Sequence, residues 1–188
     1  QKTAYDFVVG DWSSDVCSAD LVEKDRIRVG LSVTAGPESM YIQAAGKDFK
    51  IQWLEITGAP HAVVPYPDVF QAGDSAIHEL GSAIRWHARF PQGTNVNFVE
   101  IKGRSALDQR TFERGVEGET LACGTGATAS VLGLARLGLL DSPVAVRTRG
   151  GELQVSFLRE KDGFREIFLG GEARFIAEGS IDPEAWSF

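Results

Sequence analysis

The sequence has few cysteines, an acidic rather than a basic excess, and no long apolar run. Two cysteines among 188 residues do not make a disulfide framework, so a reducing cytoplasm fits best. The formal net charge of −7 disfavours nucleic acids and acidic membrane surfaces as partners. No apolar run is long enough to cross a bilayer, and the N-terminus lacks the basic-then-apolar pattern of a signal peptide. The remaining composition, 43% hydrophobic and 24% charged, is that of a globular domain.

An almost wholly apolar run follows a glycine-rich turn in the second half of the chain. Residues 127–140 carry Arg136 as their only charge. A helix that is apolar all round must be covered on all sides, so we predict a buried central helix here. Residues 141–143, Asp-Ser-Pro, are expected to end it. Gly124 and Gly126, just before this run, free the backbone to bring N–H groups toward a bound group.

Cys123 lies beside these glycines and is the first candidate for a functional residue. The unpaired N–H groups and the helix dipole favour an anion there, and the same field is expected to lower the pKa of the thiol. A carboxylate beside the thiol would be held by the N–H groups of Gly124 and Thr125. The alternative is a buried structural cysteine. Glu113 and Arg114 upstream supply an acid and a guanidinium, which favours the functional interpretation.

Alternating apolar segments between turn residues predict many short strands. We expect strands at residues 5–9, 26–33, 40–43, 49–56, 95–101, 107–113, 144–148, 153–158, 167–169 and 173–177, turns at residues 36–37, 58–61, 150–151 and 161–163, a helix from Ser75 to about Trp86 capped by Asp74, and a C-terminal tail packed through Trp186 and Phe188. The predicted fold class is α+β, with a mostly antiparallel, barrel-like sheet wrapped around the central apolar helix.

Two segments together resemble a known family. Residues 112–115, Phe-Glu-Arg-Gly, and 119–127, Glu-Thr-Leu-Ala-Cys-Gly-Thr-Gly-Ala, closely resemble the second active-site signature of the diaminopimelate epimerases. Residues 58–61, Gly-Ala-Pro-His, and residues 90–98 are similar to further segments of that family, and the resemblance extends from about residue 26 to residue 181. It implies barrel-like lobes that each surround a central helix, an amino-acid substrate, no cofactor or metal, and a homodimeric full-length protein.

The resemblance also implies a reaction. Two thiols on opposite faces of the substrate, one a thiolate base and one a thiol acid, interconvert LL- and meso-diaminopimelate for lysine and cell-wall synthesis. Cys123 would be one of the pair, and Gly124 and Thr125 would hold the α-carboxylate. His61 and Glu113 would tune the pKa of the thiol, and Glu113 would also contact the substrate.

The distal end of the substrate is assigned in the same way. Arg114 would pair with the distal carboxylate, and Asn95 would hydrogen-bond the distal amino-acid end. Ala59 stands where the family has an asparagine whose amide contacts the substrate. Because alanine has no amide, that contact is not expected here.

The N-terminal residues are anomalous. Residues 11–21 have neither helical nor strand periodicity and look like translated sequencing-adapter DNA, a hypothesis that intact codons in re-amplified source DNA would refute. The first lobe's Cys-Gly-Asn-Gly-type motif has no counterpart, and Cys17 has neither a glycine turn nor an apolar helix beside it. We expect residues 1–25 to be a remnant of the N-terminal lobe plus this segment, residues 26–188 to be the C-terminal lobe, and the chain to be inactive or nearly so.

Other functions compete with this interpretation. Residues 124–129 fit a loose dinucleotide-binding pattern, but residues 113–122 are too polar for the buried parallel strand that it needs. A hydrolase using Cys123 and His61 has no evident third residue. A sister racemase of the proline racemase group would share the two-thiol logic. The alternative outside enzymes is a lone lobe that only binds an anion at its helix N-terminus.

Overall fold

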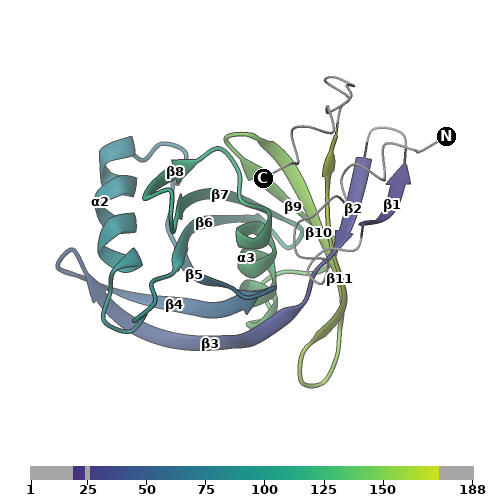
Figure 1. The fold of residues 1–188 in the computed structure, drawn as a ribbon, viewed down its shortest axis with the longest axis horizontal. Helices are drawn as coiled ribbons and strands as arrows, with labels where there is room; N and C mark the ends of the chain where they lie inside the picture. Colours follow the sequence, from purple (N-terminus) through teal and green to yellow (C-terminus); the bar gives the residue numbers. More distant parts are fainter. Residues whose placement is uncertain (1–18, 24–25, 174–188) are drawn as a thin grey trace, which may run out of the picture.

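The structure is a computed structural model that describes residues 19–23 and 26–173 (Figure 1). The strands among these residues are β1 (Ala19–Glu23), β2 (Arg26–Gly30), β3 (Val33–Ala44), β4 (Lys47–Ile56), β5 (Ala59–Pro65), β6 (Asn95–Gly103), β7 (Ala106–Glu113), β8 (Gly118–Thr120), β9 (Val144–Thr148), β10 (Gly151–Arg159) and β11 (Phe164–Glu172). The helices are α2 (Asp74–Arg85) and α3 (Gly124–Arg136). Neither helix of this described part is long and apolar enough to cross a membrane.

These strands form one sheet, in the order β1-β2-β11-β10-β9-β7-β6-β5-β4-β3, with β8 paired to β7. Neighbours are antiparallel except for the parallel pairs β5–β6 and β7–β9. The predicted α+β class with a mostly antiparallel sheet is therefore confirmed. Consecutive strands β2 and β3 pair with β11 and with β4, far apart in the sheet order. The short link between β2 and β3 is hydrogen-bonded toward both of these partner strands. The Leu31 N–H donates to the Ile167 carbonyl, and the Ser32 carbonyl accepts the Thr57 N–H.

Strands β5 and β6 are buried on both faces, because α2 and α3 lie on opposite sides of them (Figure 1). Along β5, Val63 packs in the core around α3, whereas Val64 packs in the core beneath α2. Along β6, Val99 belongs to the α3 core and Phe98 to the α2 core. Successive side chains of a strand point to opposite faces, so residues of the same parity as Val63 and Val99 face α3.

Helix α3 is buried along nearly its whole length, from Gly126 to Ala135. It contacts β3, β4, β5, β6, β10 and β11. It ends at Arg136, before the predicted stop at residues 141–143, which is therefore wrong. Gly138, at φ +75°, donates its N–H to Ala135, and the Leu139 N–H donates to Leu134, which is the glycine-terminated Schellman arrangement.

The predicted turn at residues 36–37 is also wrong. Gly36 and Pro37 lie inside β3, at an irregularity in its pairing with β4. Gly36 has φ +81°, and a Cβ there would lie 2.6 Å from the Trp53 carbonyl oxygen. Glycine at this position therefore lets β3 bend closely over β4 without ending.

The turn predicted at residues 58–61 is shorter than expected. Thr57 and Gly58 form the connection, with φ of 52° and 78°, and Ala59 already begins β5. Two central residues with positive φ are typical of a type I′ hairpin. His61 is consequently a strand residue rather than a residue after a turn.

Several further predictions meet a mixed outcome. The strands predicted at residues 95–101, 107–113, 144–148 and 153–158 are confirmed within β6, β7, β9 and β10. Residues 26–33, predicted as one strand, divide between β2 and the first residue of β3, and residues 19–21, predicted to lack strand structure, belong to β1. Asp74 is the first residue of α2 rather than its cap, which is Gly73. Some predictions lie outside the described residues: the strand at residues 5–9, all but the first residue of the strand at 173–177, Cys17, Trp186 and Phe188.

Candidate active site

Cys123 occupies the N-cap position of α3. Its backbone is extended, with φ −134° and ψ 111°, and its carbonyl accepts the Ala127 N–H at 2.8 Å. The cap makes no side-chain hydrogen bond, and the first turn of the helix contains no acidic residue. Gly124 and Thr125 form the start of this turn and are half-buried. No capping side chain of the described residues therefore competes for the N–H groups that the sequence assigned to a carboxylate.

His61 reaches this thiol through Thr125. The His61 ring is fully buried, and its Nε2 lies 3.0 Å from Thr125 Oγ1, which in turn lies 3.7 Å from Cys123 Sγ. Asn97 Nδ2 lies 3.2 Å from the other ring nitrogen, Nδ1. Burial, followed by the nearby Arg114 guanidinium, lowers the pKa of His61 to about 3. The imidazole is therefore neutral at physiological pH and cannot stabilise a thiolate as a cation.

The Cys123 thiol is shifted in the direction opposite to the prediction. Burial raises its pKa to about 11, with the Glu113 carboxylate as the next cause. The Thr125 hydroxyl and the Gly126 N–H act against this rise. Thr120 Oγ1 donates to Glu113 Oε1 at 2.6 Å and holds that carboxylate in place. The predicted lowering was wrong because the turn that presents the helix terminus also encloses the thiol and sets a negative charge beside it.

Asn95 and Arg114 form a second part of the site. Asn95 Oδ1 accepts the Arg114 backbone N–H at 2.8 Å, and its Nδ2 donates to the Pro60 carbonyl at 3.0 Å. Arg114 as a whole residue is half-buried, and its guanidinium donates to the Gln92 carbonyl at 3.4 Å. Asn95 is also the partner of His61 in the β5–β6 pairing, which joins this part to the thiol. The predicted site residues therefore gather where α3 begins, β5 and β6 begin, and β7 ends.

Two acids of the motif have structural roles instead. Glu119 accepts from the buried Arg110 guanidinium at 2.5 Å, and Asp74 accepts from the same guanidinium at 2.7 Å. Glu117 pairs with Arg85 at 3.0 Å. These ion pairs tie the turn before α3 to β7 and α2. The charge of the turn, which the sequence associated with function, is thus accounted for by structure.

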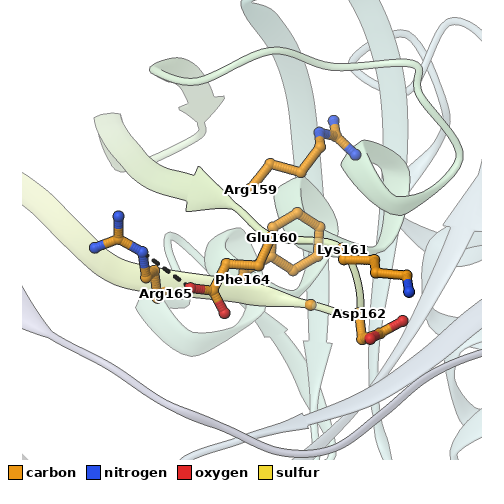
Figure 2. A pocket seen from close by; sticks show the side chains of 7 residues that line it. Arg159, Glu160, Lys161, Asp162, Phe164 and Arg165 are labelled. Carbon is orange, nitrogen blue, oxygen red and sulfur yellow. Dashed lines mark ion pairs between the residues drawn. The ribbon is translucent and has the colours of Figure 1, made fainter.

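A surface depression lies elsewhere, around the β10–β11 hairpin (Figure 2). Arg159 on its rim donates to the Ala135 carbonyl at 2.6 Å, at the C-terminal end of α3. Arg165 pairs with Glu160 at 3.0 Å (Figure 2). Because α3 has 13 residues, about 20 Å of helix separates this end from Cys123. The depression is not part of the thiol site.

Other chemistries find less support in the described part of the chain. It contains no group of three or more histidine, cysteine or acidic side chains that could hold a metal ion. The strand before α3 is the short β8, which pairs antiparallel with β7 and does not fit a dinucleotide-binding unit. Asn97 and Thr120 are the site residues that sequence reasoning missed. The sequence of residues 95–99 could have indicated Asn97. In a strand Asn97 shares its face with Val99, which packs in the core around α3.

A family model described as diaminopimelate epimerase matches residues 54–176. The chain is 39% identical over 177 residues to a diaminopimelate epimerase of Aquifex aeolicus (strain VF5), with 92% of this chain and 61% of the relative covered. It is 44% identical over 135 residues to a diaminopimelate epimerase of Paraburkholderia xenovorans (strain LB400), with 70% and 45% covered. The chain therefore spans about half to three fifths of the length of these curated relatives.

A solved structure of a probable proline racemase from Agrobacterium radiobacter K84, with bound carbonate, is also similar. The TM-score is 0.55 at 18% identity, and the likeness covers 85% of this chain and 54% of that one. At such identity the likeness concerns the fold alone.

Proposed function

Because this chain belongs to the diaminopimelate epimerase family, we propose that its described residues supply one half of a cofactor-independent site that interconverts LL- and meso-diaminopimelate. The observation that carries the proposal is the Cys123 thiol at the start of the buried α3, connected to His61 and adjacent to Glu113. We further propose that the sheet forms a barrel-like lobe around α3. The pairing of β2 with β11 and of β3 with β4 supports this closure.

Inversion at the α-carbon requires a proton to leave from one face and another to arrive from the opposite face. In this proposal a base on the far face removes the α-proton, and the electron pair delocalises into the carboxylate as an enediolate. The N–H groups of Gly124 and Thr125, at the positive end of α3, stabilise the charge that develops on that carboxylate. The Cys123 S–H bond then breaks as its proton forms the new C–H bond.

The electrostatics of the site favour this direction of proton transfer. A thiol whose pKa is raised to about 11 is protonated at neutral pH, so Cys123 is ready to act as the acid. The thiolate left after donation is stabilised by the Thr125 hydroxyl and the Gly126 N–H. In the reverse reaction the same group acts as the base, by microscopic reversibility.

The distal end of the substrate belongs near Arg114 in this proposal. Its guanidinium can meet a second carboxylate with two parallel hydrogen bonds. Asn95 holds the Arg114 backbone N–H with its amide oxygen and anchors itself to the Pro60 carbonyl with its amide nitrogen. Asn95 therefore contributes first by placing Arg114, and any bond to the substrate uses its remaining amide hydrogen or oxygen lone pair.

Cys123 is the one free cysteine in the described part of the chain, so we propose that this chain alone turns over little or no substrate. The test is exchange of the α-proton of LL- and meso-diaminopimelate in heavy water, with Cys123→Ala as the matched variant and L-proline as the control substrate. We expect slow exchange that depends on Cys123 without formation of the other epimer. Exchange with inversion would show that a second acid is present and would refute the inactivity.

Two other outcomes would change the assignment. Exchange of the proline α-proton instead of the diaminopimelate α-proton would favour the sister racemase. Saturable binding of diaminopimelate without any exchange would leave a lobe that only binds an anion at α3. Equilibrium titration of Cys123→Ala with diaminopimelate separates these cases. The variant keeps the helix N–H groups, so it reports binding of the substrate without exchange.

A further inference from the structure

A line of buried polar side chains crosses the face of the sheet that packs against α3. Gln109 Nε2 donates to Thr111 Oγ1 at 3.0 Å, and Thr111 Oγ1 donates to Asn97 Oδ1 at 3.1 Å. Asn97 then contacts His61 Nδ1 at 3.2 Å, and His61 leads through Thr125 to Cys123. Asn97 and Thr111 are partners in the β6–β7 pairing, so the line runs across neighbouring strands. Apolar residues would fill this face at lower desolvation cost, because each buried polar group needs a hydrogen-bond partner. Gln109 Oε1, at the end of the line farthest from Cys123, has no partner among the described residues.

The neighbours of Asn97 determine which end of its amide faces His61. Its oxygen accepts from Thr111, whose own hydroxyl oxygen already accepts from Gln109. Its nitrogen also lies 3.4 Å from the Ala62 carbonyl, an acceptor that only the amide N–H can satisfy. The Asn97 amide therefore presents a donor to the His61 ring, and the ring nitrogen Nδ1 must carry a lone pair.

We propose that Asn97 is a positioning residue that holds His61 in the tautomer with its proton on Nε2, so that the Thr125 hydroxyl is left to donate to Cys123 Sγ. With the proton on Nε2, His61 donates to Thr125 Oγ1 at 3.0 Å. The remaining hydrogen of that hydroxyl is then free to point toward the sulfur, 3.7 Å away. The opposite tautomer would draw the Thr125 hydrogen to the ring and away from the thiol.

The packing of α3 depends on a close contact between the start of the helix and Asn97. A Cβ at Gly126 would lie 2.3 Å from Asn97 Oδ1 and 3.1 Å from Cys123 Sγ. Glycine is thus required for the helix start to approach Asn97 this closely. The charged groups that act on the relay are Glu113, beside the thiol, and Arg114, beside the imidazole.

This inference deepens the proposed function, on which the catalytic meaning of the relay rests, but its test needs no substrate. The first readout is the imidazole ¹⁵N spectrum of ¹⁵N-histidine-labelled chain, with the His61 signals assigned through His61→Gln. We expect the proton on Nε2 in the original chain and on Nδ1 in Asn97→Asp, whose carboxylate accepts where the amide donated. Asn97→Leu, which adds no charge, should lose the preference. A proton on Nδ1 in the original chain, or a tautomer unchanged in both variants, would overturn the proposal.

The second readout is the pH midpoint of Cys123 alkylation by iodoacetamide, followed on the Cys123 peptide by mass spectrometry so that Cys17 does not interfere. Thr125→Val should raise the midpoint by about one pH unit, a tenfold change in the ionisation constant. Thr125→Ser keeps the hydroxyl and should restore it, and Thr148→Val removes a buried hydroxyl elsewhere and should have no effect.

The double variant Asn97→Asp with Thr125→Val separates the relay from simple charge repulsion. Because the relay passes through Thr125, Asn97→Asp should raise the midpoint in the original chain and add nothing in the Thr125→Val background. A further rise in that background would mean that the new carboxylate acts by its charge, and the proposal would fall. If these readouts come out as expected but the chain shows no Cys123-dependent exchange of the diaminopimelate α-proton, the proposed function alone would be contradicted.

Discussion

Two ionisable side chains at the start of α3 are both held neutral at physiological pH. Burial lowers the pKa of His61 to about 3 and raises that of Cys123 to about 11. A buried charge without a partner is costly, and both groups avoid this cost by staying neutral. Each of them contacts the neutral hydroxyl of Thr125. The thiol therefore stays protonated at physiological pH. The imidazole acts as a hydrogen-bond donor rather than as a counter-ion.

Replacing Glu113 by glutamine is expected to lower the pH midpoint of Cys123 alkylation. The substitution removes the negative charge that, after burial, most disfavours the thiolate. The rate of alkylation at neutral pH should rise with the thiolate fraction. Glu152→Gln, an exposed acid on β10, is the control and should leave the midpoint unchanged. A midpoint that rises in Glu113→Gln would contradict this account.

His61 should make the stability of the chain depend on pH. Its pKa is near 6.5 when unfolded and about 3 when folded, so below pH 6.5 the unfolded state takes up a proton that the folded state does not. The stabilisation that neutral His61 gives the folded chain is fully present above pH 6.5. It is lost as the pH falls toward 3, at up to about 1.4 kcal/mol of unfolding free energy per pH unit.

Urea unfolding between pH 7 and pH 5 measures this slope. We expect His61→Gln to flatten it, whereas His78→Gln, an exposed residue on α2, should not. The comparison is of slopes and not of absolute stability, because His61→Gln also alters the hydrogen bonds of the ring. Equal slopes in the two variants would show that His61 titrates normally in the folded chain.

The start of α3 depends on close approach to the sheet. Gly126→Ala places a methyl group against Asn97 and Cys123, so we expect a loss of about 1 to 3 kcal/mol in the free energy of unfolding from overpacking. Gly103→Ala, where a Cβ would meet no atom within 4 Å, is the matched control. Urea denaturation provides the measurement. A stabilised Gly126→Ala chain would mean that α3 is not tightly seated on β6.

The molecule as a whole has two cores that share strands. Leu132 of α3 and Ile84 of α2 are both fully buried, on opposite sides of β5 and β6. Because these strands belong to both cores, neither core can lose its packing without exposing the other's strands. The described residues should therefore unfold cooperatively.

Leu132→Ala and Ile84→Ala are each expected to cost about 2 to 5 kcal/mol of unfolding free energy. Both should shift one common urea transition, seen alike by far-UV circular dichroism and by pulse alkylation of Cys123. The control is Leu158→Ala, whose side chain is exposed. A chain in which Ile84→Ala unfolds α2 while Cys123 stays protected would contradict the shared-strand account.

Local patterns were sufficient for much of the framework. The apolar run after residue 126 predicted a buried helix, and the alternation of residues 153–158 predicted the strand that β10 contains, because these patterns are local to one element. Gly36-Pro37 was mistaken for a turn because pairing with β4 continues β3 through it. The end of α3 was misplaced because the Gly138 signal is a single residue inside an apolar stretch.

The sequence by itself determined the place of the thiol, at a glycine-rich helix start, because composition and periodicity are local properties. Only the tertiary structure decided the state of that thiol. The Glu113 carboxylate lies beside Cys123, and Thr125 links the thiol to His61 and Asn97, which belong to strands well upstream in the chain. Electrostatic energies depend on distance and burial in space, so the expected lowering of the thiol pKa became a rise when those segments came together.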